Sequence, residues 1–343
     1  MKYIVRAVAF ALLFVMVGAT LVSCVSLKPT EQDLKVVAKV GEYEVYYDEL
    51  RYFTMNFIRQ MKGRYTEEEL KVPAVKAKYE KELQENVISA ILLNYAVLAA
   101  CDFYKVDHEH EAILEKANED VDLYIESFGG KKEYKKALEE NYMTDRFFRF
   151  YQRLEYARSE LKYVLADDLG IIPGTEKELK DFMLSDDFIC TRHICLLKDG
   201  ETDIDTLKQK MQMIYDKLEE GADFETLIGT YSEDFQDTGK GYYFTHSEML
   251  EPYEEAAFDL RVGEYSDIVE TDIGFFIIMR FSKDRGYMLG EEKPDGTIPN
   301  NNYANFVYQI QYALTEQEIE AFKETLNFVF TEYGKSLVLS EME

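Results

Sequence analysis

Positive charge is scarce in this sequence. The 343 residues contain 39 lysines and arginines against 66 aspartates and glutamates. Residues 1–23 include Lys2 and Arg6 but no acidic residue, so the rest of the chain has 37 basic against 66 acidic side chains, a balance of −29. Because affinity for nucleic acid rests on cationic contacts to phosphate, this balance excludes nucleic acid as a partner. The excess of acid serves solubility or the attraction of basic client proteins.

Cysteine is scarce as well, with four residues in the chain. Cys190 and Cys195 flank His193, an arrangement that invites a disulfide or a metal site. If residues 188–197 form a strand, the two Cα atoms lie ~16 Å apart and the sulfurs point to opposite faces, which excludes both readings. Cys101 ends an apolar helical stretch and is expected to be a small buried hydrophobe. We therefore expect no disulfide, no metal and no other cofactor.

Long apolar runs are confined to the N-terminus. A nearly pure apolar run over 7–22 follows Lys2 and Arg6, which is typical of a signal peptide. We identify no second run after it that is long enough to cross a membrane. The run is also short for a membrane-spanning helix, which needs about 20 residues, so an uncleaved anchor is the weaker alternative.

The end of this run resembles the bacterial lipobox, in which a cysteine thiol is lipidated and becomes the mature N-terminus. Here Leu21-Val22-Ser23 precedes Cys24, and polar residues follow. We predict a signal peptide over 1–23 and a lipid anchor on Cys24, which places the chain on the extracytoplasmic face of the cell membrane.

Helical periodicity dominates the first half of the mature chain. After a polar tether over 24–35 and a hairpin over 36–46, apolar residues recur at helical spacing. Asp48 is expected to be the N-cap of the first helix, and Thr175 with Glu178 forms a capping box. The predicted helices lie at 47–61, 75–101, 108–128, 132–141, 144–166 and 176–184.

Residues 186–285 have a different texture, with short β-rich runs alternating with helices. This pattern predicts an α+β module of the size of one small domain. A loop rich in Gly, Pro and Asn follows over 286–302, and a final helix is expected over 315–333. We find no internal repeat.

Seven spaced motifs run through this module. In order they are Thr191-Arg192-His193-Ile194, Gly221-Ala222-Asp223-Phe224, Tyr231-Ser232-Glu233-Asp234, Gly239-Lys240-Gly241-Tyr242, Met249 with Tyr253 and Phe258, Gly263-Glu264-Tyr265-Ser266, and Gly274-Phe275-Phe276-Ile277-Ile278. The series resembles the parvulin family of prolyl isomerases, which reads in outline A-R-H-I-L, G-x-D-F, Y-S-x-D, G-G-D-L-G, M-x-x-x-F-E-x-A-A-F, G-E-x-S and G-x-H-I-I. A lipobox, a helical region and a parvulin module in succession also resemble the layout of PrsA- and SurA-like extracytoplasmic foldases.

The resemblance implies an α+β fold in two parts. The first is a mostly helical chaperone-like domain over 36–185, completed by a C-terminal helix within 286–343 that packs on it. The second is a small parvulin-like domain over 186–285 with a four-stranded antiparallel sheet.

The resemblance also implies roles for individual residues. His193 matches the first of two core histidines, Asp234 a Cys-or-Asp position near the substrate carbonyl, and Thr271 a hydroxyl that hydrogen-bonds His193. The apolar pocket for the proline ring corresponds to Met249, Tyr253, Phe258 and Phe276. Without the motif order, the apolar members read as ordinary core at helical spacing, His193 as a satisfied core histidine and Asp234 as a turn residue.

Two departures from the family pattern matter for catalysis. Phe276 stands where the second histidine is expected, and the Gly-Asp-Leu-Gly turn has become Gly239-Lys240-Gly241-Tyr242. Phenylalanine cannot hydrogen-bond His193, so the paired-histidine network is incomplete and the pocket floor is more apolar. The sequence leaves open whether Phe276 abolishes rotation about the X-Pro bond.

Two functions follow from the resemblance. One is a prolyl isomerase that acts on unfolded exported proteins containing X-Pro bonds. The alternative is a holdase chaperone with a weakened or inactive parvulin module, in which an aromatic stretch over 147–156 is mostly buried and partly forms a cradle for clients. A solute-binding lipoprotein is opposed by the long helical region over 48–166, and a homodimer through the helical arms stays open.

Overall fold

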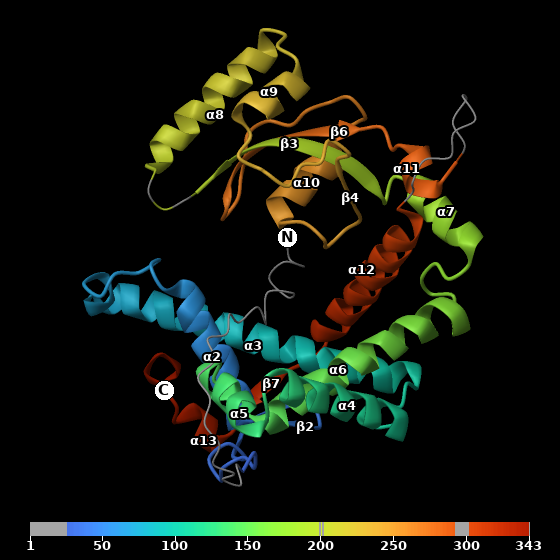
Figure 1. Cartoon of the computed structure of the whole chain (residues 1–343). Coiled ribbons are helices and arrows are strands. Elements are labelled where there is room, and N and C mark those ends of the chain that lie inside the picture. The colour runs from blue at the N-terminus through green and yellow to red at the C-terminus, as the bar shows by residue number, and fades with distance from the viewer. Residues whose placement is uncertain (1–25, 199, 201, 292–301, 343) are drawn as a thin grey trace. The chain divides into compact units, whose positions relative to one another are not determined.

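The structure is a computed structural model that describes residues 26–198, 200, 202–291 and 302–342 (Figure 1). The chain divides into two compact units. The sheet unit comprises Gly170–Leu314, and the helical unit combines the described residues up to Leu169 with those from Thr315 onward. The expected signal peptide and Cys24 lie outside the described residues.

The helical unit consists mainly of five helices. Its helices are α2 (Tyr47–Met61), α3 (Pro73–Tyr104), α4 (Glu111–Ser127), α5 (Lys131–Glu140), α6 (Asp145–Tyr163) and α13 (Glu332–Lys335), its strands β1 (Val36–Val40), β2 (Tyr43–Tyr46) and β7 (Phe328–Phe330), and its short turns η2 (Glu69–Lys71), η3 (Val164–Asp168) and η4 (Leu339–Glu341). The hairpin and α2 to α6 lie where the periodicity predicted them. Half of the aromatic stretch on α6 is buried, with Phe147, Phe148 and Leu154 at 4% exposure or less, whereas Phe150, Tyr151 and Tyr156 are half-buried.

One detail of α2 differs from the prediction. The helix begins after Tyr46, whose side chain makes no cap hydrogen bond, so Asp48 is not the N-cap. Asp48 instead lies fully buried in the first turn, where Thr144 and Arg146 donate hydrogen bonds to it. A charged partner from a distant helix therefore replaces the local backbone donor that an N-cap would use.

The helix α3 is, among the described residues, long and apolar enough to cross a membrane by length and composition alone. This corrects the expectation that no such run follows the N-terminus. Half of its most apolar window is buried inside the fold, and Leu83, Val87 and Ile91 are fully buried. This burial is the pattern of a core helix.

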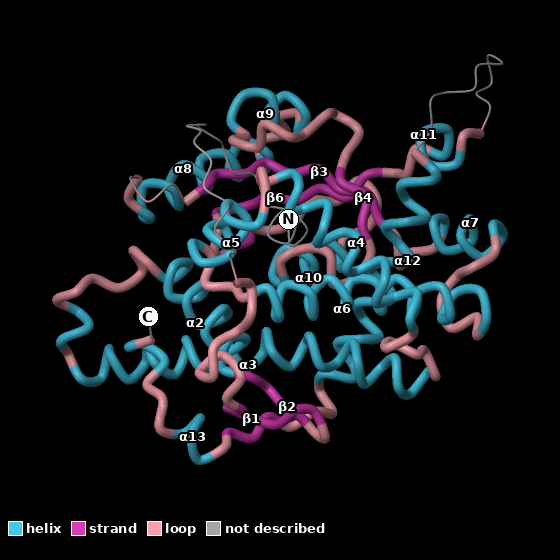
Figure 2. The backbone as a smooth tube through the Cα atoms, turned by 60° about the horizontal axis from the view of Figure 1, so that its bottom comes forward, coloured by secondary structure: helices cyan, strands magenta, loops and turns pink. Residues whose placement is uncertain are grey.

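The C-terminal segment completes the helical unit, as predicted, but with different elements. The expected helix over 315–333 is instead α12 (Tyr303–Lys323), after which the chain forms β7. β7 pairs antiparallel with β1, giving a three-stranded sheet in the order β2-β1-β7. Figure 2 shows β1 and β2 of this sheet side by side in magenta. A Cβ at Gly334 would lie 1.9 Å from the carbonyl oxygen of Val37, so glycine is required where the chain passes this sheet.

The expected tether is partly packed on the same unit. Asp33 is buried, and it accepts hydrogen bonds from the backbone and hydroxyl of Thr30 and lies 3.7 Å from Arg51. Gln32 hydrogen-bonds the hydroxyl of Tyr333. Residues 30–35 therefore belong to the folded body.

The sheet unit has the predicted four-stranded antiparallel sheet, in the order β4-β3-β6-β5 (Figure 1). Its elements are α7 (Glu176–Leu184), β3 (Ile189–Leu197), α8 (Ile204–Glu219), α9 (Phe224–Tyr231), β4 (Tyr242–Phe244), α10 (Glu251–Asp259), β5 (Val269–Glu270), β6 (Gly274–Phe281), α11 (Arg285–Leu289) and the first half of α12. The predicted capping box of Thr175 and Glu178 opens α7.

The two central strands carry different cores on their two faces. Ile194, Leu196 and Ile277 pack with α8 and α9, whereas Cys195 and Phe276 pack with α10. Figure 1 shows α8 and α9 on one side of the sheet and α10 on the other. The three described cysteines are free and buried, and Cys190 and Cys195 belong to different hydrophobic clusters.

The sheet unit is larger than the expected domain over 186–285. It begins at Gly170 and extends to Leu314, so α7 and the first half of α12 belong to it. The physical reason is a hydrophobic cluster in which Met183 of α7 and Phe306 of α12 pack around Phe188.

Candidate functional site

The imidazole of His193 lies at the centre of a buried polar cluster on the α10 face of the sheet. His193 is 9% exposed, and both ring nitrogens have partners. Its Nε2 lies 3.0 Å from Oδ2 of Asp234, and its Nδ1 lies 2.9 Å from the hydroxyl of Tyr253. The same Tyr253 hydroxyl lies 2.9 Å from Oγ1 of Thr191.

The charge state of Asp234 orders the protons in this cluster. The hydrogen bond from His193, with further bonds from Tyr242 and the backbone of Gln236, lowers the pKa of Asp234 to about 2. An ionised carboxylate only accepts hydrogen bonds, so Nε2 of His193 carries a proton. In the neutral imidazole Nδ1 is then an acceptor, so Tyr253 donates to it and accepts from Thr191.

The loop that carries Asp234 is fixed to the strand of His193. The Ser232 hydroxyl accepts from the backbone N–H of Cys195 at 3.1 Å and donates to the carbonyl of His193 at 3.4 Å. The backbone N–H of Gln236 donates to Asp234 at 2.9 Å. Asp234 is therefore held against His193 by its own loop as well as by the imidazole.

Tyr242 covers one face of the imidazole. Its ring stacks on His193 with centroids 5.2 Å apart and planes at 5°, and its hydroxyl donates to Asp234. Burial is the main cause that raises the pKa of Tyr242, so the hydroxyl stays protonated. Sequence reasoning did not assign a role to Tyr242; the available signal was its position in the altered glycine turn.

Phe276 is the aromatic neighbour of this cluster. Its ring lies edge-on to His193, with centroids 5.2 Å apart, and edge-on to Tyr253, with centroids 5.5 Å apart. Phe276 and Tyr253 are each 4% exposed. The residues expected from the motifs therefore converge, but these two are internal rather than open to a ligand.

Met249 and Phe258 are the accessible apolar members of the expected pocket. Both are half-buried and pack against the hydrophobic cluster that contains Tyr253 and Phe276. The ring of Phe258 also stacks on His246 with centroids 3.8 Å apart. A ligand on this face would meet Met249 and Phe258 before it met Tyr253 or Phe276.

Thr271 does not take the role expected for it. Its hydroxyl donates to the carbonyl of Gly274 at 3.1 Å and accepts from the backbone of Ile273 and Gly274. The nitrogens of His193 are occupied by Asp234 and Tyr253 instead. The prediction of a hydrogen bond between Thr271 and His193 is therefore wrong, because Thr271 closes the turn between β5 and β6.

Comparison with known proteins finds a family match within the sheet unit. Residues 179–284 match the family model described as a PPIC-type PPIASE domain. The foldase protein PrsA of Geobacillus kaustophilus is 27% identical over 226 residues, which is 64% of this chain and 71% of that protein. Residues 179–284 are a parvulin domain, and the chain is similar to the PrsA foldases.

Two further relatives differ in how much they cover. The PrsA foldase of Geobacillus sp. is 34% identical over 128 residues, which is 36% of this chain and 43% of that protein. The crystal structure of the peptidylprolyl isomerase PrsA from Bacillus anthracis is 21% identical, with a TM-score of 0.33, and covers 67% of this chain and 92% of that one. The similarity to PrsA foldases rests on the sequence matches.

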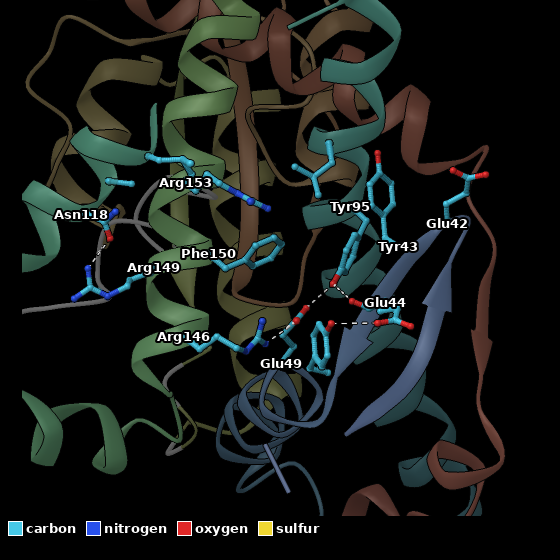
Figure 3. Close-up of a pocket in the computed structure, with 14 residues that line it drawn as sticks. Glu42, Tyr43, Glu44, Glu49, Tyr95, Asn118, Arg146, Arg149, Phe150 and Arg153 are labelled. Carbon is cyan, nitrogen blue, oxygen red and sulfur yellow. Dashed lines mark hydrogen bonds and ion pairs between the residues drawn. The ribbon is translucent and has the colours of Figure 1, made fainter. Parts of the chain in front are cut away.

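The helical unit of this PrsA-like chain has a pocket of about 590 Å³ (Figure 3). Arg146, Arg149 and Arg153 recur on one face of α6 along it, and Figure 3 shows Phe150 and Tyr95 projecting into the space beside them. The other lining residues are Glu42, Tyr43, Glu44, Tyr46, Glu49, Leu98, Leu114, Ala117 and Asn118.

A buried carboxyl group lies at the base of this pocket. Glu49 is 1% exposed; Arg146 donates to it at 2.8 Å and Tyr95 at 2.9 Å. Burial, which outweighs both partners, raises the pKa of Glu49 to about 7. The neighbouring carboxylate of Asp48 shares Arg146 and acts in the same direction.

Proposed function

We propose that this chain is a prolyl isomerase that acts on unfolded exported proteins and is held at the extracytoplasmic face of the membrane by a lipid on Cys24. The observation that carries the isomerase is the pair of His193 and Asp234 beside the half-buried side chains of Met249 and Phe258, within a parvulin domain. The lipid anchor rests on the sequence pattern around Cys24.

The chemistry requires no nucleophile. Rotation about an X-Pro bond has a barrier of about 18–20 kcal/mol because amide resonance is lost in the twisted state. An enzyme lowers this barrier when it binds the twisted imide better than the planar one. Met249 and Phe258 supply apolar surface for the pyrrolidine ring, which removes water from the imide.

Asp234 supplies the electrostatic part of this preference. The planar imide carries excess negative charge on its carbonyl oxygen, and twisting returns part of that charge to the nitrogen. A carboxylate held ionised near that oxygen opposes the planar state more than the twisted one. His193 and Tyr242 keep Asp234 ionised and in place.

An exchange experiment on a proline-containing peptide tests the proposal. We expect the full chain to accelerate cis–trans exchange in NMR spectra, and His193→Ala and Met249→Ala each to lower kcat/KM by about tenfold or more. His110→Ala is the matched control, because His110 caps a helix of the other unit. Exchange no faster than the uncatalysed rate would refute the isomerase.

The anchor has its own test. Cys24→Ala is expected to move the chain from the membrane fraction to the soluble fraction of the producing cells without a change in isomerase rate. An N-terminal peptide of unmodified mass in the wild-type protein would contradict the anchor.

A second function is favoured by the pocket of the helical unit. Its aromatic side chains and arginine planes offer surface for unfolded segments, which supports a holdase role alongside isomerisation. We expect Leu114→Glu to weaken suppression of client aggregation, because Leu114 lines the pocket. Leu123→Glu, an exposed position on the same helix, is the matched control, and an equal loss in both variants would refute the role of the pocket.

A further inference from the structure

Three departures from the parvulin outline are connected through Tyr253. Thr191 stands in place of alanine, Tyr253 in place of phenylalanine, and Phe276 in place of histidine. The Tyr253 hydroxyl joins Thr191 to His193, and the Phe276 ring lies edge-on to both Tyr253 and His193. The three substitutions therefore form one site rather than three independent changes.

We propose that Tyr253 is the positioning residue of His193. The Tyr253 hydroxyl accepts a hydrogen bond from Thr191 and holds the imidazole, and so takes over the role of the second family histidine, whose position is occupied by Phe276. The inference rests on the proposed isomerase function, which it deepens. Tyr253 acts through His193 and Asp234 and does not itself touch the substrate.

The hydrogen bonds of a neutral His193 imidazole fit this arrangement. Nε2 of His193 donates to Asp234, so Nδ1 needs a donor, and a buried acceptor without one is costly. Phe276 offers no donor, and Tyr253 lies 2.9 Å from Nδ1. Since Tyr253 donates its proton to His193, the Tyr253 oxygen accepts a hydrogen bond from Thr191. The two oxygens lie 2.9 Å apart, and Thr191 is fully buried.

Packing explains why Phe276 belongs to the same arrangement. Once Tyr253 occupies Nδ1, a second imidazole at 276 would be a buried polar ring without a partner. The phenylalanine ring instead fills this space with its edge toward His193 and Tyr253. An apolar residue at 276 is thus the expected companion of a hydroxyl at 253.

Tyr253→Phe removes one oxygen and tests the proposal directly. We expect kcat/KM for exchange of the proline peptide to fall by about tenfold, the effect of one hydrogen bond to a positioned group. We also expect the ¹⁵N resonance of His193 Nδ1 to move toward the position of a nitrogen without a hydrogen bond. Tyr243→Phe is the matched control, since the buried Tyr243 hydroxyl accepts from the backbone of Asp284 and is not hydrogen-bonded to His193.

Phe276→His tests whether Tyr253 has replaced the second histidine or whether the site is only a less active parvulin site. Alone, it is expected to raise kcat/KM less than threefold, because Nδ1 is already occupied; together with Tyr253→Phe, it is expected to restore most of the lost rate. A gain above tenfold from Phe276→His alone would overturn the proposal. So would a Tyr253→Phe variant whose Nδ1 resonance and kcat/KM match the wild type.

The resonance keeps the two proposals distinguishable. If the wild-type chain does not accelerate exchange, the isomerase function fails, while the Nδ1 shift still reports whether Tyr253 holds His193. If exchange is fast and the shift is absent in Tyr253→Phe, this inference fails and the isomerase function stands.

Discussion

The two units each hold a hydrogen-bonded carboxylate among aromatic rings, yet the pKa values of the two carboxylates shift in opposite directions. In the sheet unit, donors from His193, Tyr242 and the Gln236 backbone converge on Asp234 and lower its pKa to about 2. In the helical unit, Glu49 receives Arg146 and Tyr95 but has a pKa raised to about 7. The difference shows that the number of partners does not decide the charge state.

Solvent access and competition account for the difference. The Asp234 side chain keeps 16% of its surface exposed, whereas Glu49 is enclosed and shares Arg146 with the fully buried Asp48. Desolvation penalises the ionised form most where water is absent. The sheet unit therefore holds a stable negative charge at its site, while the helical unit holds a carboxyl group that titrates near neutral pH.

The largest expected effect on stability comes from removing Arg146, the cation shared by Asp48 and Glu49 in the helical unit. Arg146→Met leaves Asp48 and Glu49 buried without their cation, and we expect the free energy of unfolding to fall by about 3–5 kcal/mol. Urea unfolding followed by circular dichroism measures this. Arg149→Met, on the same face of α6, is expected to cost about 1 kcal/mol or less, because the Arg149 side chain keeps 30% of its surface exposed. Equal costs for the two variants would contradict the distinction.

The titration of Glu49 gives the next largest effect. Its pKa is raised on folding, so its contribution to stability is complete below about pH 4.5 and is lost as the pH rises through about 7. Glu49→Gln should therefore gain stability relative to the wild type across this window, by up to about 3 kcal/mol. Melting temperatures from pH 4.5 to 8 measure this, and the exposed pocket residue Glu42, as Glu42→Gln, is the control. Parallel curves for Glu49→Gln and the wild type would refute the raised pKa.

Tyr95, which contacts Glu49 in the helical unit, offers a test with a smaller expected effect. The single proton of the Tyr95 hydroxyl is shared between two acceptors, Oε2 of Glu49 at 2.9 Å and the carbonyl of Glu44 at 2.8 Å. Because Tyr95→Phe removes a hydrogen bond to a charged acceptor, we expect unfolding to become easier by about 1.5–3 kcal/mol. We also expect the pKa of Glu49 to rise further, which ¹³C NMR of its carboxyl group reports; an unchanged titration would contradict the contact.

The smallest effect concerns Asp234. Tyr242 donates to this carboxylate and helps to lower its pKa. Tyr242→Phe keeps the ring on His193 but loses that donor, so the pKa of Asp234 should rise while staying below its ordinary value near 3.8. Carboxyl ¹³C titration between pH 1.5 and 5 measures it. An Asp234 pKa that does not move would show that His193 alone sets the charge.

Much of the fold was predictable because it follows from periodicity and motif order. Helical spacing placed α2 to α6, and the spaced motifs predicted the antiparallel sheet that brings His193, Asp234 and Tyr253 together. The hydrogen-bond partners were not predictable in the same way. Thr271 bonds its own turn and Tyr253 bonds His193, choices that depend on side-chain direction rather than on spacing.

Long-range pairing set the other limit. Phe328–Phe330 is too short a run to be distinguished from the end of a helix, and only its pairing with β1 makes it a strand. Asp48 likewise followed the rule for a helix N-cap, but Arg146, nearly a hundred residues later, determined its role. Sequence reasoning fails where the deciding partner lies far along the chain.

The strand β7 has a consequence for the order in which the two units can fold during synthesis. Every described residue of the sheet unit precedes Thr315, whereas the helical unit lacks one strand of its sheet until Phe328–Phe330 has been synthesised. Until then the outer edge of β1 offers unpaired backbone groups to any neighbouring chain. Among the described strands, β1 thus gains its second neighbour late, and deletion of Phe328–Phe330 would leave that edge unpaired.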